Sequence, residues 1–305
     1  MPSAVAGVTI GRYVRDVAQP GSALAWGVSG RWFKSSHPDH FFRTGGRVPA
    51  PGSFRALMIL VCNDDGIESE GLARLVEAVE GLDQTVVVAP DRERSAVSHA
   101  LTLERPLRAD EIRPGWYSVD GTPTDCINLA VNGLLEERPW LVVSGINRGA
   151  NLGDDITYSG TVSAAMEALL LGMPAVAFSQ VGRPPFDYTA AVSFATALVE
   201  RVAEQALPPD TILNVNVPES PPAPDGYLIT RQGKRRYGDA VVEKTDPRGR
   251  KYYWIGGDEL GFEDEAGTDF EAIAAGKVSI TPLHLDLTNY ESIEPLRGLK
   301  VGWPE

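Results

Sequence analysis

The feature that most constrains the fold is an apolar run that ends in two adjacent carboxylates, residues 58–66 (MILVCNDDG). Five consecutive apolar residues are typical of a buried central strand in a parallel sheet. Ligands of open α/β sheets bind at the carboxyl ends of such strands, which is where Asp64 and Asp65 stand. Two neighbouring acids repel each other unless a proton or cation lies between them, and carboxylate oxygens suit a hard divalent cation. The stretch therefore predicts a metal site or, because Asn, Asp and Gly are common in turns, a solvent-facing turn.

The residues that follow alternate helix patterns with strand patterns. Apolar residues recur with a helical period in residues 68–80, and the strand–helix–strand unit over residues 58–89 has the length of a right-handed crossover. Further strands are expected at residues 85–89, 140–143, 175–178, 212–217 and 277–281, and further helices at residues 159–171 and 187–206 and at the end of the chain. Strands that alternate with helices indicate a doubly wound α/β sheet.

Composition and charge exclude several classes of protein. The net charge of -13 argues against a broad nucleic-acid surface, and no run of 18 apolar residues exists that could span a membrane. The only cysteines, Cys62 and Cys126, lie in apolar surroundings and are typical of reduced core residues. With four histidines in the whole chain, a zinc site built from His and Cys is not expected. These features predict a cytoplasmic protein with no nucleic-acid or membrane partner.

The first 57 residues differ in character from the rest. Residues 1–57 carry more bases than acids, show no sustained helix or strand period and contain no apolar core of signal-peptide length. A basic, acid-poor leader fits a transit peptide. Residues 17–39 also resemble the peptide obtained by translating a bacterial tRNA gene, as happens when a start codon is placed too far upstream. We therefore expect the natural protein to begin at or near Met58, with residues 1–57 a disordered extension and residues 58–305 the functional domain.

Four polar loops are expected at one edge of the sheet, because parallel strands place their carboxyl ends on the same side. They are residues 63–66, 89–95, 144–155 and 158–162. Together they offer an oxygen-only set for a hard cation, with positions left open for water and substrate. That candidate set is Asp64, Asp65, Ser95 and Asn147.

The fourth loop offers a phosphate site beside the candidate metal. Ser159, Gly160 and Thr161 open a helix, where backbone N–H groups and the positive end of the helix dipole favour an anion. Taken alone, Ser159 is more often simply an N-cap. A metal next to an anion cradle suggests phosphate ester chemistry. His284, which follows an apolar strand pattern, fits a structural or a catalytic role, and His99 fits a structural one better.

The C-terminal part is polar and aromatic. Residues 227–254 contain turn signals at Gly233, Gly238 and 246–249, which predict one or two β-hairpins projecting from the sheet. The basic run 234–236 fits either a phosphate or nucleic-acid contact or a solvated or intersubunit face.

Taken together, the motifs of residues 58–305 resemble those of the SurE family, the stationary-phase survival proteins that act as 5′-nucleotidases. The matching stretches are residues 59–66 (ILVCNDDG), 87–95 (VVAPDRERS), 121–128 (GTPTDCIN), 143–151 (VSGINRGAN), 158–165 (YSGTVSAA), 214–218 (NVNVP), 246–257 (DPRGRKYYWIGG), 267–270 (GTDF) and 278–288 (VSITPLHLDLT). No match touches residues 1–57.

The resemblance implies a Rossmann-like three-layer α/β/α sheet with a projecting C-terminal β-hairpin arm, residues 227–256. It implies one divalent metal ion, Mg²⁺ or Mn²⁺, on the four oxygen donors named above. The implied activity is hydrolysis of nucleoside 5′-monophosphates, with 3′-nucleotides and short polyphosphate accepted by some members. The implied assembly is a homodimer or homotetramer in which the arm is exchanged between subunits. One departure is Tyr290, at a position where family members can carry a histidine.

In the mechanism that we expect, Asp64 orients or deprotonates the attacking water, and Asn151 with residues 159–161 holds phosphate oxygens. A haloacid-dehalogenase-type phosphatase would need Asp-x-Asp after the strand, whereas Asp64 and Asp65 are adjacent. Dinucleotide-binding and P-loop glycine motifs are absent from the sequence. The remaining alternative is an inactive metal-dependent binding or assembly protein on the same fold.

Overall fold

Strands from the whole length of the described chain assemble into one nine-stranded sheet. A computed structural model describes residues 57–219, 222–236, 241–255, 261–299 and 301–302, so the expectations for residues 1–56 lie outside the described residues. The strand order is β3-β4-β2-β1-β5-β6-β7-β13-β8. The strands are β1 (Met58–Cys62), β2 (Gln84–Pro90), β3 (Ala109–Arg113), β4 (Trp116–Val119), β5 (Leu141–Arg148), β6 (Ala175–Gln180), β7 (Ile212–Val217), β8 (Tyr227–Ile229) and β13 (Val278–Leu283).

The centre of the sheet is parallel. β1 pairs in parallel with β2 on one side and β5 on the other, and β5, β6 and β7 continue the parallel order. The antiparallel pairs are β3 with β4 and β13 with β7. The carboxyl ends of β1, β2 and β5 therefore reach the same edge of the sheet, as predicted.

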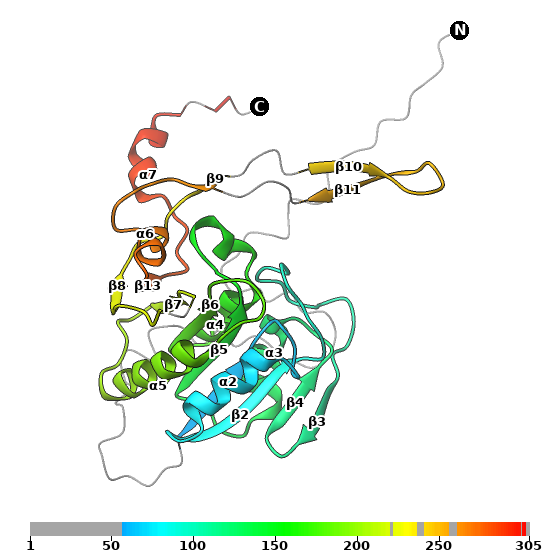
Figure 1. Cartoon of the computed structure of the whole chain (residues 1–305), viewed down its shortest axis with the longest axis vertical. Helices are drawn as coiled ribbons and strands as arrows, with labels where there is room; N and C mark the ends of the chain where they lie inside the picture. The colour runs from blue at the N-terminus through cyan, green and yellow to red at the C-terminus, as the bar shows by residue number, and fades with distance from the viewer. Residues whose placement is uncertain (1–56, 220–221, 237–240, 256–260, 300, 303–305) are drawn as a thin grey trace. The chain divides into compact units, whose positions relative to one another are not determined.

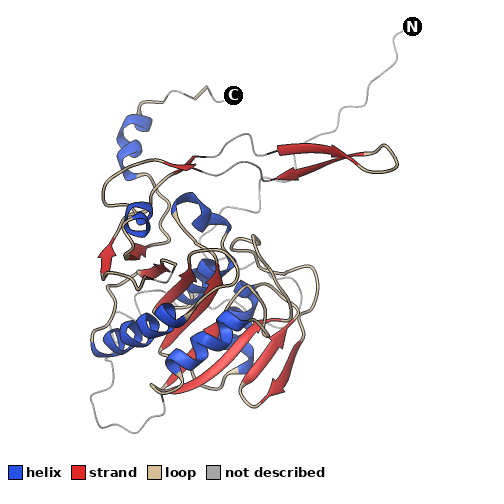
Figure 2. Ribbon diagram, viewed as in Figure 1, coloured by secondary structure: helices blue, strands red, loops and turns tan. Residues whose placement is uncertain are grey.

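Helices cover both faces of the sheet (Figures 1 and 2). α2 (Glu70–Val79) and α5 (Thr189–Glu204) pack on one face, and α3 (Pro123–Leu129) and α4 (Gly160–Leu170) pack on the other. Successive side chains of a strand point to opposite faces, so Ile59 and Val61 of β1 join the first layer, while Leu60 and Cys62 join the second. This arrangement confirms the predicted three-layer α/β/α fold and explains why β1 is apolar throughout.

The helix boundaries follow from local chemistry. The side chain of Ser69 accepts from the backbone N–H of Leu72 and caps α2, which buries the apolar stripe that the sequence predicted. At the start of α3, Thr122 and Asp125 form a reciprocal capping box and Pro123 takes the first helical position. A π-helical turn, η1 (Ala130–Leu134), continues α3, and a 3-10 helix, η2 (Gly153–Tyr158), precedes α4.

The C-terminal part holds more elements than the sequence patterns predicted. β10 (Val241–Thr245) and β11 (Lys251–Ile255) form the expected antiparallel hairpin, and the side chain of Asp246 accepts two backbone N–H groups within its turn. Every residue of these two strands is exposed. α7 (Tyr290–Arg297) is the predicted final helix and buries none of its residues. Three short elements were not predicted: β9 (Arg235–Arg236), β12 (Gly261–Phe262) and α6 (Asp269–Ala274).

None of the helices in the described part of the chain has the length and apolar character that crossing a membrane requires.

Candidate metal and phosphate site

The two adjacent acids lie at the carboxyl end of β1 and are not solvent-facing. Asp64 is 4% exposed, and the side chain of Asp65 is also 4% exposed. Burial is the main cause that raises the pKa of Asp64 to about 6; the charge of Asp65 adds to the rise and a hydrogen bond from the Thr161 hydroxyl opposes it. These exposures contradict the solvent-facing turn considered above. The hydrogen bonds that this carboxylate accepts do not offset the cost of burying its charge, and a bound cation would stabilise that charge.

The start of α4 packs directly against Asp64. A Cβ placed on Gly160 would lie 2.7 Å from the Cβ of Asp64, so only glycine permits this approach. The side chain of Ser159 accepts from the backbone N–H of Val162 at 3.1 Å and caps the helix. The three predicted phosphate-binding residues, Ser159, Gly160 and Thr161, are therefore brought beside the first acid. The loop that carries them follows the 3-10 helix η2, whereas the sequence analysis placed it after a strand.

Asp65 is paired with an arginine to which the sequence analysis gave no role. Nε of Arg148 donates to Oδ1 of Asp65 at 2.9 Å, and the backbone N–H of Arg148 donates to Oδ2 at 3.1 Å. The guanidinium also contacts Glu93 at 3.3 Å. The hydrogen bond to Asp65 raises the pKa of Arg148. A cation that binds Asp65 must share this carboxylate with Arg148 or displace it. The signal available in sequence was that Arg148 directly follows the candidate ligand Asn147.

Ser95 lies in the loop after β2 and Asn147 lies in β5, and these two strands flank β1. The hydroxyl of Ser95 donates to Oε1 of Glu93 at 2.9 Å, which links the loop after β2 to Arg148. Asn147 lies within β5, near its end, where the pairing with β6 is irregular; the sequence analysis expected it in a loop after a shorter strand. Its side-chain nitrogen donates to the Gly149 carbonyl at 2.9 Å, so its amide oxygen is the atom left to bind a cation.

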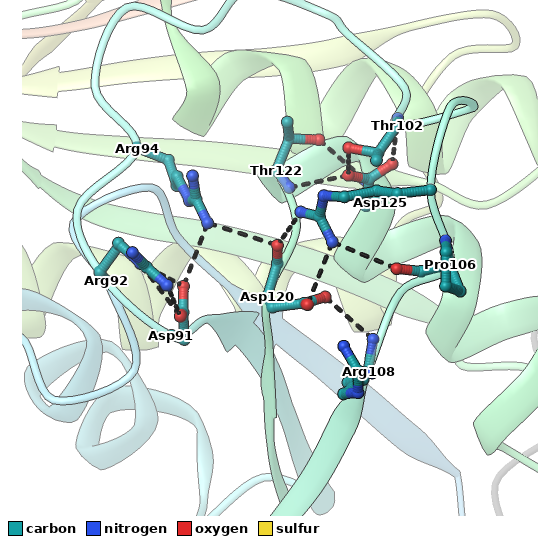
Figure 3. Close-up of polar contacts among 10 residues, drawn as sticks. Asp91, Arg92, Arg94, Thr102, Pro106, Arg108, Asp120, Thr122 and Asp125 are labelled. Atoms are coloured by element: carbon teal, nitrogen blue, oxygen red, sulfur yellow. Dashed lines mark hydrogen bonds and ion pairs between the residues drawn. The ribbon is translucent and has the colours of Figure 1, made fainter.

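A polar network holds the loop that carries Ser95 (Figure 3). The guanidinium of Arg94 donates to the side chain of Asp91 at 3.2 Å and to the carbonyl of Asp120 at 3.3 Å. Its backbone N–H donates to the carbonyl of Asp64 at 2.7 Å. The hydrogen bond from Arg92 is the main cause that lowers the pKa of Asp91, which therefore stays ionised as the partner of both arginines. The loop after β2 is thereby fixed to the end of β1.

Asn151, the fourth predicted phosphate-binding residue, lies in a buried network of amides. Its side-chain nitrogen donates to the Ser179 hydroxyl at 2.8 Å, and its backbone N–H donates to Oδ1 of Asn216 at 2.8 Å. Its carbonyl accepts from the side chains of Asn214 and Asn216. These bonds give Asn151 a structural role, and its contact with phosphate stays a prediction.

A cavity of about 900 Å³ opens at this edge of the sheet. Asp65, Ser95 and Arg148 line it on one side, and the loop between β6 and α5 lines it with Pro184, Pro185, Phe186 and Tyr188. Among the described residues, no group of three or more His, Cys, Asp or Glu side chains is arranged to hold a metal ion. The candidate set differs from such clusters because it combines two carboxylates with neutral oxygens.

The family model described as "Survival protein SurE" matches residues 59–239. The chain belongs to the SurE family. It is 60% identical over 242 residues to a protein of Syntrophotalea carbinolica named 5′-nucleotidase SurE, an alignment covering 79% of this chain and 96% of that relative. A protein of the same name from Geobacter metallireducens is 59% identical over 243 residues, with 79% of this chain and 96% of the relative covered.

A solved structure shows the same fold. The crystal structure of the SurE protein from Aquifex aeolicus matches with a TM-score of 0.70 and 45% sequence identity, and the match covers 79% of this chain and 98% of that one. The family resemblance argued from the sequence motifs is confirmed. Members of this nucleotidase family are generally metal-dependent.

Proposed function

We propose that the chain is a metal-dependent phosphomonoesterase that hydrolyses nucleoside 5′-monophosphates to nucleoside and phosphate, with 3′-nucleotides and short polyphosphate as further substrates. The observation that carries the proposal is the buried pair Asp64–Asp65 beside the N-terminus of α4. Relatives 56–60% identical to this chain bear the name 5′-nucleotidase. This naming favours the enzyme over the alternative of an inactive binding or assembly protein.

One divalent ion, Mg²⁺ or Mn²⁺, fits the donors Asp64, Asp65, Ser95 and Asn147. All four offer oxygen, the ligand that these hard cations prefer, and the two carboxylates supply the opposite charge. When bound, such an ion lowers the pKa of a water ligand and neutralises charge that develops on the phosphoryl oxygens. The raised pKa of Asp64 supports this assignment, because the cost of burying this charge outweighs the hydroxyl and backbone hydrogen bonds that it accepts.

The residues around the acids would position the reacting groups. The Thr161 hydroxyl donates to Oδ1 of Asp64, so Oδ2 is the atom that would orient the attacking water or accept its proton. The backbone N–H of Gly160, the first residue of α4, would hold a phosphate oxygen, because it lies at the positive end of the helix. Asn151 would contribute the second hydrogen of its amide nitrogen to the phosphate.

The assembly that we propose is a homodimer or homotetramer in which the arm, residues 227–256, is exchanged between subunits in the cytoplasm. An isolated two-stranded hairpin is marginally stable in water, and β10 and β11 expose every residue, including Tyr253 and Trp254. Packing against a second subunit would cover this surface. A full-length chain that sediments as a monomer at micromolar concentration would contradict the proposal. Residues 237–240 and 256 of the arm lie outside the described residues.

The test of the activity is phosphate release from a panel of nucleotides with Mn²⁺, Mg²⁺ or EDTA. The chain should release phosphate from nucleoside 5′-monophosphates with metal and lose this activity in EDTA. Asp65→Asn should weaken metal binding, measured by calorimetry, and should lower the rate. Asp110→Asn, which changes an exposed acid on the edge strand β3, is the matched control and should leave both unchanged. Full turnover by Asp65→Asn in EDTA would refute the metal assignment, and no release from any phosphoester would favour the binding protein.

A further inference from the structure

The apolar part of the cavity lining comes mainly from a single loop. The loops after β1 and β2 line the cavity mainly with charged groups such as Glu68, Arg92 and Glu93. The loop that joins β6 to α5 adds Pro184, Pro185 and Phe186. This loop leaves the carboxyl end of β6, which pairs with β5 beside the candidate ligand Asn147. Two candidate metal ligands, Asp65 and Ser95, and an aromatic side chain therefore share one cavity.

Tyr188 supports this surface from behind. It is 4% exposed, and a Cβ placed on Gly71 would lie 3.5 Å from Cε1 of Tyr188 and 2.0 Å from the carbonyl oxygen of Ile146. The tyrosine ring is thus held close to both α2 and the end of β5. The ring of Phe186 lies with its centroid 6.0 Å from that of Tyr188, at an interplanar angle of 32°. Such contact with a buried neighbour restrains Phe186 without covering it.

The ring of Phe186 borders two cavities. It lines the cavity of about 900 Å³ that contains Asp65 and also a neighbouring cavity of about 390 Å³ lined by Arg74 and Val192. The phenylalanine therefore stays partly open to solvent, although an aromatic ring of its size contributes strongly to a core when it is covered. A partly exposed aromatic ring that packs against the core and lines a polar cavity is suited to stacking against a flat ligand.

We propose that Phe186 is the stacking surface for the nucleobase of the substrate, and this assignment rests on the proposed function. A nucleoside monophosphate carries an anion at one end and a flat aromatic ring at the other, and the cavity is lined both by the candidate metal ligands Asp65 and Ser95 and by Phe186. Stacking accepts every base because every base has a π-face, so Phe186 would favour nucleotides over phosphoesters without a base and would select little among bases. Purines, with the larger rings, should gain more than pyrimidines.

The experiment compares AMP with ribose 5-phosphate, which lacks the base, as substrates of the full chain with Mn²⁺. Phe186→Ala should raise the KM for AMP by roughly 5- to 100-fold, as expected for loss of one base–aromatic contact, and should leave kcat nearly unchanged. The KM for ribose 5-phosphate should not change. Phe186→Trp should retain the wild-type KM for AMP. Leu170→Ala, which removes an apolar side chain that is 62% exposed on α4, is the control and should alter neither substrate.

Equal changes in KM for both substrates, or no change for either, would overturn the assignment. Wild-type protein that releases phosphate from neither substrate would contradict the proposed function instead. Adenosine binding measured by calorimetry separates these cases because it needs no turnover. Weaker adenosine binding by Phe186→Ala supports the stacking surface, whereas equal binding by wild type and variant refutes it.

Discussion

Replacing Asp64 by asparagine should make the metal-free protein more stable at neutral pH. The buried carboxylate is held by the Thr161 hydroxyl, and asparagine keeps an oxygen that can accept this bond. The substitution therefore removes the charge and retains the shape and the principal contact. It isolates the free-energy cost of holding a charge in a site that, in our proposal, is built for a cation.

The magnitude follows from the pKa of Asp64. Burial is the main cause that raises this pKa from 3.8 to about 6. Each unit of pKa difference between the folded and unfolded states corresponds to about 1.4 kcal/mol. The ionised side chain therefore lowers the free energy of unfolding by about 3 kcal/mol at pH 7.5, and Asp64→Asn should recover an amount of this order. For a domain of this size that is a rise of roughly 6–12 °C in Tm.

The pH dependence has a definite sign. Because the pKa of Asp64 is higher in the folded state than in the unfolded state, its favourable contribution is complete below pH 3.8 and is lost as the pH rises through about 6. The difference in stability between variant and wild type should be fully developed at pH 7.5. It should shrink as the pH is lowered from 6 toward 3.8.

Metal should reverse the order of stability. A ligand that binds only the folded state at a concentration about 1,000 times its Kd stabilises by about 4.1 kcal/mol, which exceeds the cost of about 3 kcal/mol of the ionised Asp64. Calorimetric unfolding of wild type, Asp64→Asn and the control Asp110→Asn should therefore be measured in EDTA and in saturating Mn²⁺. Wild type should gain stability with metal and Asp64→Asn should not. If the variant is less stable than wild type in EDTA at pH 7.5, or if Mn²⁺ stabilises both equally, the reasoning is wrong.

Two further substitutions test the packing that holds the site. Gly71→Ala would place a Cβ 2.0 Å from the Ile146 carbonyl oxygen, so urea titration should show a loss of about 1–3 kcal/mol; Gly81→Ala, with nothing within 4 Å, should be neutral. Asp269→Ala would remove a fully buried carboxylate that accepts N–H groups from two neighbouring loops, and the same titration should show a loss of about 3 kcal/mol.

The central elements could be predicted because their signals are local. The apolar run of β1 and the helical period of α2 each report burial directly, and the Thr122–Asp125 capping box specifies where α3 begins. The edge strand β3 and its neighbour β4 were not predicted. Four of the five residues of β3 are exposed, and its sequence (ADEIR) has no alternation of apolar and polar residues, because an edge strand with an open face buries little.

Local sequence patterns predicted the site residues that lie at strand ends, but they did not predict contacts between residues distant in sequence. Strand ends located Asp64, Asp65 and Asn147, since parallel strands bring their carboxyl ends together. Arg148 binds Asp65 across 83 positions of sequence, and no local pattern specifies which carboxylate an arginine will reach. The position of Phe186 in the cavity likewise depends on how the loop after β6 folds back over α2, which is a tertiary property.

The two adjacent acids differ in the partners that stabilise their negative charge, and this difference argues for a cation at Asp64. Asp65 already has a guanidinium partner in Arg148, so its charge is compensated by the protein itself. Asp64 is the more buried of the two residues and has only hydrogen-bond donors, the Thr161 hydroxyl and backbone N–H groups, which stabilise a carboxylate less than a full positive charge does. The protein pairs Asp65 with a guanidinium and gives Asp64 hydrogen-bond donors alone at the start of α4, so Asp64 is the acid whose charge a bound cation would stabilise more.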